Sequence, residues 1–145
     1  MLVHINRVLG WLFLFSTVGV GVELFLQDHY ETWWQRAPLI ALGAGTLTGL
    51  AILLAPGRGI LNVHRIFMLT FIAGGFIGTY LHYQVNEEFE LELYPSMKGL
   101  ELFQKSIKGA IPALAPFAMM HVGLLGLVST YRFPVDTPSS PGKIN

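Results

Sequence analysis

The residues that decide the fold run from Arg65 to Pro95, RIFMLTFIAGGFIGTYLHYQVNEEFELELYP. The stretch begins with a cation, continues as a nearly unbroken apolar run to about Tyr83, and then becomes strongly acidic. A run of this kind, with charges confined to its two ends, is typical of a helix that crosses a bilayer. The stretch therefore predicts a membrane span with a basic inner end and an acidic outer end.

Composition places the whole chain in the membrane class. Of its 145 residues, 52% are hydrophobic and 12% are charged, and its mean hydropathy is +0.53. Soluble domains carry roughly 25% charged residues, and a short chain buries too small a share of its surface to hide so much apolar area. We therefore expect the lipid bilayer to surround much of the protein.

Charge, cysteine content and motifs exclude several other classes. The formal net charge is 0, and Lys and Arg do not cluster among aromatic residues, so no nucleic-acid partner is expected. The chain has no cysteine, which excludes disulfides, thiolate metal sites and a cysteine nucleophile. It also lacks the HExxH, P-loop, GxSxG and glycine-rich dinucleotide motifs, so we predict no catalytic residues and no enzyme activity.

Hydropathy predicts an all-α integral membrane protein built as an antiparallel bundle of four transmembrane helices. The spans are expected at about 8–26, 38–55, 66–83 and 110–131. The first apolar run lacks a small-residue cleavage pattern, so it is interpreted as a span and not as a signal peptide. Together the spans form a domain of residues 1–131, and the Pro- and Ser-rich residues 132–145 are predicted to be a disordered cytoplasmic tail.

Two prolines are informative about these spans. Pro38 suits the first turn of the second span, where a backbone N–H has no helical partner. Pro116 is expected to bend the fourth span, because proline removes a helix hydrogen bond and clashes with the preceding turn.

The outer loop, residues 84–109, separates the third and fourth spans. Its first part alternates glutamates with Phe89, Leu91 and Leu93, and this two-residue period predicts an extended segment with one apolar edge. Such an edge needs a cover, so these three residues are predicted to bind a partner or the membrane surface. Ser96 is then expected to cap a short amphipathic helix that lies on the periplasmic surface.

Orientation follows from the distribution of cations. In a four-span layout one side holds Arg7, Arg58, Arg65, Arg132 and Lys143, and the other side holds most of the acids. The positive-inside rule then predicts a multi-pass protein of a prokaryotic inner membrane, with both termini in the cytoplasm.

Glycines recur within the spans at helical spacing. The pairs are Gly45 and Gly49, Gly74 and Gly78, and Gly123 and Gly126. Small residues four apart allow helix backbones to approach closely in lipid. The first two pairs are the predicted helix-packing residues, and the same faces are alternatives for self-association or for another subunit.

Polar residues near the outer ends of the spans form a candidate metal site. Glu23 and His82 lie at similar depth on the first and third spans. One interpretation is a hydrogen-bonded pair that joins two helices. The other is a metal site, in which His29 and the pair Glu87 and Glu88 join them as nitrogen and oxygen ligands.

His121 is the candidate for binding a cofactor, because ionisable residues near the middle of a span are costly and often functional. It is interpreted as a neutral imidazole bonded to a neighbouring helix, as an axial ligand to haem or chlorin, or as part of a proton path. A two-ligand haem needs a second histidine at this depth, and none is present. His4 and His64 are expected near lipid phosphates at the inner edge, and so not at the depth of His121. We therefore expect that the protein binds no cofactor.

The segment from His82 to Pro116, HYQVNEEFELELYPSMKGLELFQKSIKGAIPALAP, and the exit at Tyr131 and Arg132 carry a resemblance. They resemble small four-span bacterial inner-membrane proteins of unassigned function. This resemblance implies the four-span layout and the outer loop, and no catalytic residues. The layout is also similar to oxidase-associated membrane proteins and to four-helix b-type cytochromes, although the paired histidines of the latter are missing.

These observations lead to one primary hypothesis and two alternatives. The primary hypothesis is a non-catalytic accessory, structural or assembly subunit of a larger inner-membrane complex, of respiratory or photosynthetic type. The first alternative is a haem- or chlorin-binding transfer protein that uses His121. The second is a small transporter or metal-handling protein that uses Glu23, His82 and the acidic loop.

Overall fold

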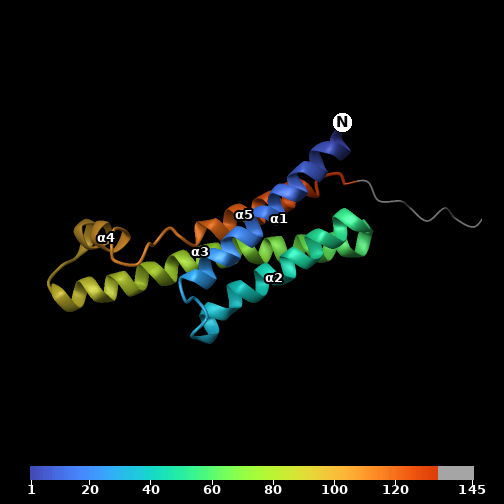
Figure 1. The fold of residues 1–145 in the computed structure, drawn as a ribbon. Helices are drawn as coiled ribbons and strands as arrows, with labels where there is room; N and C mark the ends of the chain where they lie inside the picture. Colours follow the sequence, from blue (N-terminus) through green and yellow to red (C-terminus); the bar gives the residue numbers. More distant parts are fainter. Residues whose placement is uncertain (134–145) are drawn as a thin grey trace, which may run out of the picture.

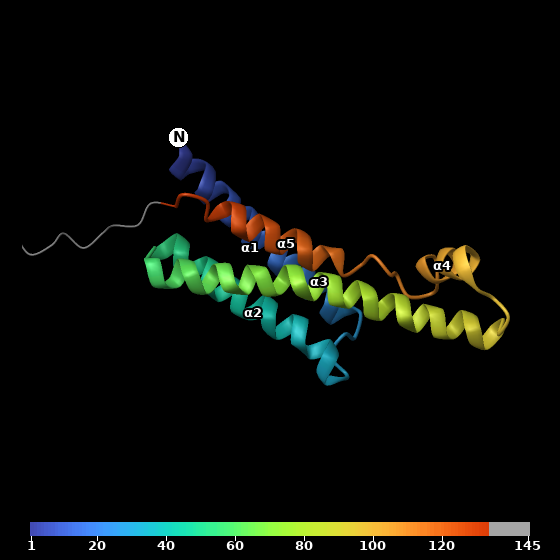
Figure 2. The same cartoon turned by 180° about the vertical axis from the view of Figure 1, so that it is seen from behind.

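In the computed structural model, which describes residues 1–133, all regular structure is helical (Figure 1). The five helices are α1 (Leu2–Leu26), α2 (Trp33–Leu54), α3 (Arg58–Leu93), α4 (Gly99–Ile107) and α5 (Phe117–Ser129). Helices α1, α2, α3 and α5 run antiparallel to their chain neighbours in one bundle, and α4 folds against the far half of α3 (Figures 1 and 2). The predicted tail lies outside the described residues apart from its first two positions.

Three of these helices, α1, α2 and α3, are long and apolar enough to cross a membrane. They contain 25, 22 and 36 residues, which at about 1.5 Å per residue correspond to roughly 38, 33 and 54 Å. The hydrocarbon core of a bilayer is about 30 Å thick. The chain is therefore an all-α protein with three candidate spans, and α3 is much longer than a crossing requires.

The fourth expected span is helical only in its second part. Helix α5 has 13 residues, about 20 Å, and begins directly after Pro116. The prediction that Pro116 bends a longer helix was wrong: residues 110–116 are not helical, and Pro116 is the N-cap. Proline has no N–H to bond to the carbonyl four residues earlier, and its ring clashes with that carbonyl. A helical turn before Pro116 is therefore disfavoured, and α5 starts directly after it.

The prediction of an extended segment after residue 84 was also wrong, because α3 continues without interruption to Leu93. Alternation of Glu with Phe and Leu matches a strand period, but Glu and Leu are also good helix formers. In the helix, Phe89 and Leu93 lie one turn apart on one side, and Leu91 points in another direction. The predicted partner-binding set is thereby divided between two sides of α3.

Two helix starts differ from expectation for local reasons. Helix α2 begins at Trp33, because Thr32 and Gln35 form a reciprocal capping box, with Gln35 Oε1 accepting from Thr32 N at 2.8 Å. Pro38 therefore lies inside α2 and not in its first turn. Helix α4 begins after Lys98, without a side-chain cap, so the expected capping role of Ser96 is wrong.

The core of the bundle is built from large apolar side chains around close glycine contacts. Its most buried members include Phe13, Met68, Phe71 and Val122. These side chains come from α1, α3 and α5, and glycines on α2 and α5 provide the space for them. Such close approach is how membrane helices gain packing contacts where lipid weakens the hydrophobic drive.

Three of the predicted packing glycines lie at helix contacts. A Cβ on Gly45 would lie 2.6 Å from Phe71, on Gly49 2.7 Å from Phe13, and on Gly78 2.8 Å from Pro116. At Gly74, by contrast, an added Cβ meets nothing within 4 Å. The packing residue at this point of α3 is therefore the next glycine, Gly75, and not Gly74.

Gly75 makes the contact that was expected of its neighbour, with a Cβ position 3.0 Å from Pro116 O and from Met120 N. Successive helical residues point about 100° apart, so a one-residue change turns the small side chain from the surface into the interface.

Candidate functional site

The outer part of the structure is organised by two polar side chains of α3 that hold the non-helical segment before α5. His82 Nδ1 lies 3.1 Å from Pro112 O, and because a carbonyl only accepts, the ring carries its proton on Nδ1. Asn86 Nδ2 donates to Ser106 O at 2.9 Å and to Ile111 O at 2.7 Å, and Asn86 Oδ1 accepts from Ile111 N at 3.0 Å. Asn86 is 2% exposed.

These contacts explain how the irregular segment is tolerated beside a helix of the bundle. Backbone N–H and C=O groups away from water need partners, and Asn86 and His82 supply three of them. Two residues of the segment, Pro112 and Pro116, have no N–H to satisfy. Sequence patterning did not reveal Asn86, because it stands among acids and looks like an ordinary loop residue.

Beyond His82, α3 projects as the first arm of an outer hairpin whose second arm is α4 (Figure 2). The eleven-residue distance to Leu93 corresponds to roughly 16 Å of helix. Tyr83 and Phe103 pack at 5.9 Å between ring centroids, and Ser106 is fully buried between the arms. The amphipathic α4 thus packs on α3, with part of its apolar face still exposed.

An apolar stripe runs along the projecting arm. Its outer part consists of three exposed residues at four-residue spacing: Val85 (48% exposed), Phe89 (51%) and Leu93 (56%). It continues toward the bundle through exposed Ile77 and Leu81. Four-residue spacing keeps these side chains on one slowly turning face of the helix. We call Ile77, Leu81, Val85, Phe89 and Leu93 the α3 stripe, whereas Leu91 is half-buried and lies outside it.

The predicted metal ligands are not assembled into one cluster. Glu23 accepts a hydrogen bond from Gln27, four residues later, at 2.6 Å, and His82 bonds to Pro112 of the segment before α5, so each residue has a partner other than the expected one. His29 lies in the turn after α1; its burial, and secondly the charge of nearby His82, lower the pKa of His29. Within residues 1–133, no three potential ligand side chains come together.

His121 lies on the outward face of α5. It is exposed, in line with Phe117, Leu124 and Val128, which are also exposed. The spacing of four, three and four residues places all of them on one side of the helix. An imidazole among apolar, outward-facing side chains cannot be satisfied by hydrocarbon.

His64 is a buried polar residue that sequence analysis placed at the membrane edge. Its side chain is 1% exposed, its Nδ1 lies 2.9 Å from Thr48 Oγ1 on α2, and its ring packs edge-on against Phe13 of α1 at 5.0 Å. The residue is nearly two turns inside α3, and it is enclosed, although its neighbour Arg65 suggested a position at the edge. It therefore joins three helices of the bundle through one side chain.

The His64–Thr48 contact gives a testable contribution to stability. Thr48→Val removes the hydroxyl but keeps the shape, and we expect a loss of about 1 kcal/mol, as for other interhelical hydrogen bonds in membrane bundles. Thr46→Val is the matched control, because Thr46 Oγ1 bonds only to Leu42 O of its own helix, at 2.9 Å. Reversible unfolding in mixed micelles measures both, and equal losses would contradict the role of His64.

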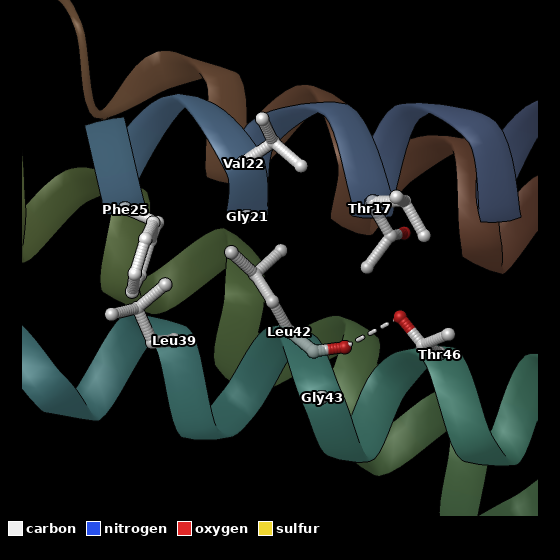
Figure 3. Close-up of a pocket in the computed structure, with 9 residues that line it drawn as sticks. Thr17, Gly21, Val22, Phe25, Leu39, Leu42, Gly43 and Thr46 are labelled. Carbon is white, nitrogen blue, oxygen red and sulfur yellow. Dashed lines mark hydrogen bonds between the residues drawn. The ribbon is translucent and has the colours of Figure 1, made fainter. Parts of the chain in front are cut away.

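A pocket of about 360 Å³ opens between α1 and α2 (Figure 3). Gly21 and Gly43 face it from opposite helices, and an added Cβ on either glycine meets nothing within 4 Å. Phe25 and Leu39 close one end, as Figure 3 shows. The lining is almost entirely apolar. The Thr46 hydroxyl donates a hydrogen bond to Leu42 O of its own helix, the dashed line in Figure 3.

No protein-family model, curated protein or solved structure matches this chain. Functional inference therefore depends on the geometry of the chain itself. The features available are the α3 stripe, the outward-facing His121, the buried hydrogen bonds of Asn86 and His64, and the basic end of the bundle.

Proposed function

We propose that the protein is a non-catalytic accessory or structural subunit of a larger membrane complex in a prokaryotic inner membrane. The observation that carries this proposal is the α3 stripe. It continues along one helix from the bundle onto an arm that extends roughly 16 Å past His82. Large contiguous apolar patches on water-facing surfaces indicate interaction sites, so a partner subunit is expected to cover it.

The proposed topology has four crossings. The fourth combines α5 with residues 110–116, which lie against α3 and are hydrogen-bonded to His82 and Asn86. Irregular backbone occurs at membrane depth where protein covers it. The ends of the bundle differ in charge, and the arginine-rich end, which includes the N-terminus of α3, is placed in the cytoplasm by the positive-inside rule. The outer hairpin then lies in the periplasm.

His121 supports the same proposal from a different face. Burying a polar group without a hydrogen bond costs at least about 1–3 kcal/mol, and a neighbouring subunit is a ready source of a donor or acceptor. The alternative cover is a tetrapyrrole, with His121 as its axial ligand. The residues of this chain do not fit that role alone, because His121 stands on an outward helical face flanked by Leu124 and not in a cavity. We therefore favour a neighbouring protein subunit as the cover of His121, in agreement with the proposed role in a larger complex.

Purification from native membranes in a mild detergent tests the proposal. We expect other membrane subunits to co-purify with the wild-type chain, and the double variant Phe89→Gln, Leu93→Gln to lose at least about 90% of them, because it places amides in an apolar contact. Leu100→Gln is the control, because it changes a leucine of α4 that is even more exposed than Leu93 and lies outside the α3 stripe. A wild-type chain that purifies alone and monomeric would contradict the proposal.

A further inference from the structure

The basic end of the bundle contains a pocket of about 270 Å³ between the start of α3 and the chain after α5. Its lining residues are Arg58, Leu61, Asn62, Arg65, Arg132 and Phe133. Three arginines and one asparagine therefore line a small space together with two apolar residues, Leu61 and Phe133. Guanidinium groups present several N–H donors in a fixed plane, the arrangement that suits phosphate oxygens.

Two of the arginines are positioned by the fold. Arg65 Nη2 donates to Thr130 O at 2.7 Å and Arg65 Nε to Thr130 Oγ1 at 3.3 Å. Asn6 of α1 donates to Tyr131 O at 3.0 Å, which fixes the next residue. Arg132 then adopts a positive φ of 48° that turns the chain, and its guanidinium lies 5.4 Å from the Tyr131 ring centroid. Arg65 and Arg132 are thus presented from fixed backbone positions.

The start of α3 adds a third contribution. Arg58 is its first residue, and the N-cap is Gly57, which has no side chain that could cap the first N–H groups. The first backbone N–H groups of a helix carry a partial positive charge and favour anions. The helix end and the three side chains therefore act in the same electrostatic direction.

Charge compensation is missing from this end in the described part of the chain. The acids within residues 1–133 are Glu23, Asp28, Glu31, Glu87, Glu88, Glu90, Glu92 and Glu101. All of them lie toward the other end of the bundle, on the second half of α1, the turn after it, the projecting half of α3, or α4 (Figure 1). Like charges held together without counter-charge favour capture of an external anion.

We propose that this pocket binds the phosphate group of an anionic phospholipid. The pocket lies at the end of the apolar helices, where headgroups are expected. On the same side of α3 as Asn62 and Arg65, the next turns present exposed Ile66 and Leu69, a surface on which an acyl chain can lie. A lipid satisfies both parts of this surface, whereas free phosphate satisfies only the arginines.

Titration of the purified full-length chain in detergent with phosphatidylglycerol tests the proposal, with phosphatidylcholine as the zwitterionic comparison. Binding is followed by native mass spectrometry and by the shift in melting temperature. We expect Arg58→Gln and Arg132→Gln each to weaken phosphatidylglycerol binding by about tenfold or more, the effect of losing a hydrogen bond to a charged group. Both side chains are exposed, so folding should be retained.

Arg7→Gln is the matched control, because Arg7 is an exposed arginine at the same end of the bundle that does not line the pocket. We expect it to weaken binding less than about fivefold, the effect of one surface cation near anionic lipid. Equal weakening by all three variants, or equal binding of both lipids, would overturn the proposal. Displacement of the lipid by low millimolar inorganic phosphate would assign the pocket to free phosphate and overturn the lipid assignment.

Discussion

Asn86→Ala is expected to release residues 95–116 from α3 while the bundle stays folded. The substitution removes three hydrogen bonds to Ser106 and Ile111 from a side chain that is 2% exposed. Each buried backbone group left without a partner costs about 1–3 kcal/mol. The segment can recover these bonds by moving into water, so local opening is the expected response, and not global unfolding.

Hydrogen exchange and limited proteolysis measure this opening. We expect Asn86→Ala to increase exchange across residues 99–116 by at least about a hundredfold, equivalent to the loss of about 3 kcal/mol. Asn86→Asp should act at least as strongly, because it places a carboxylate against the carbonyls of Ser106 and Ile111. Gln84→Ala, on the same turn of α3, is the control and should change little. Unchanged protection in Asn86→Ala would show that other contacts hold the segment.

Gly123→Ala is expected to weaken the contact between α3 and α5. A Cβ at this position would lie 2.7 Å from Met68 O, 2.9 Å from Ile72 Cγ1 and 3.0 Å from Phe71 Cβ. A backbone carbonyl of a helix cannot turn aside as a long side chain can, so the two helices have to separate. Overpacking of this kind costs about 1–3 kcal/mol, which should appear as a lower midpoint of unfolding in mixed micelles.

Gly74→Ala is the internal comparison for this experiment. It makes the same chemical change on α3 at a position where an added Cβ meets nothing within 4 Å. We expect it to be neutral or to stabilise by up to about 1 kcal/mol, the difference in helix propensity between the two residues. Equal destabilisation by both alanines would mean that the lipid-facing and buried sides of α3 have been assigned incorrectly.

Patterns within the sequence predicted the helical class and the three long apolar helices, because hydrocarbon imposes one strong and local requirement on composition. The same patterns failed where tertiary contacts decide. The outer part of α3, which includes Phe89 and Leu93, packs against α4, and Asn86 bonds to Ser106, a residue 20 positions away in the sequence. Helix α5 starts after Pro116, its N-cap, without a side-chain cap hydrogen bond, and the non-helical segment before it is held by His82 and Asn86 of α3.

Candidate residues show the same division. Spacing identified the glycine motif of α3, but only the orientation of the helix decides that Gly75, and not Gly74, faces α5. His64 was expected near lipid phosphates from its neighbour Arg65, whereas the crossing of α1 and α2 over α3 encloses it. Asn86 carried no local signal at all, because its partners are backbone groups of a segment 20 or more residues away.

The way α3 holds the end of the chain also has a consequence for biosynthesis. Arg65 binds the carboxyl end of α5 through Thr130, and Asn86 binds the segment that precedes it through Ile111. With only 13 helical residues, α5 is shorter than the roughly 20 residues of helix that cross a bilayer. In the proposed four-crossing topology, we therefore expect its insertion to depend on α3, which supplies the contacts that hold it. A chain that ends near Leu93 would leave Gly75 and Gly78 without Pro116 and Met120, the residues that cover them in the complete bundle.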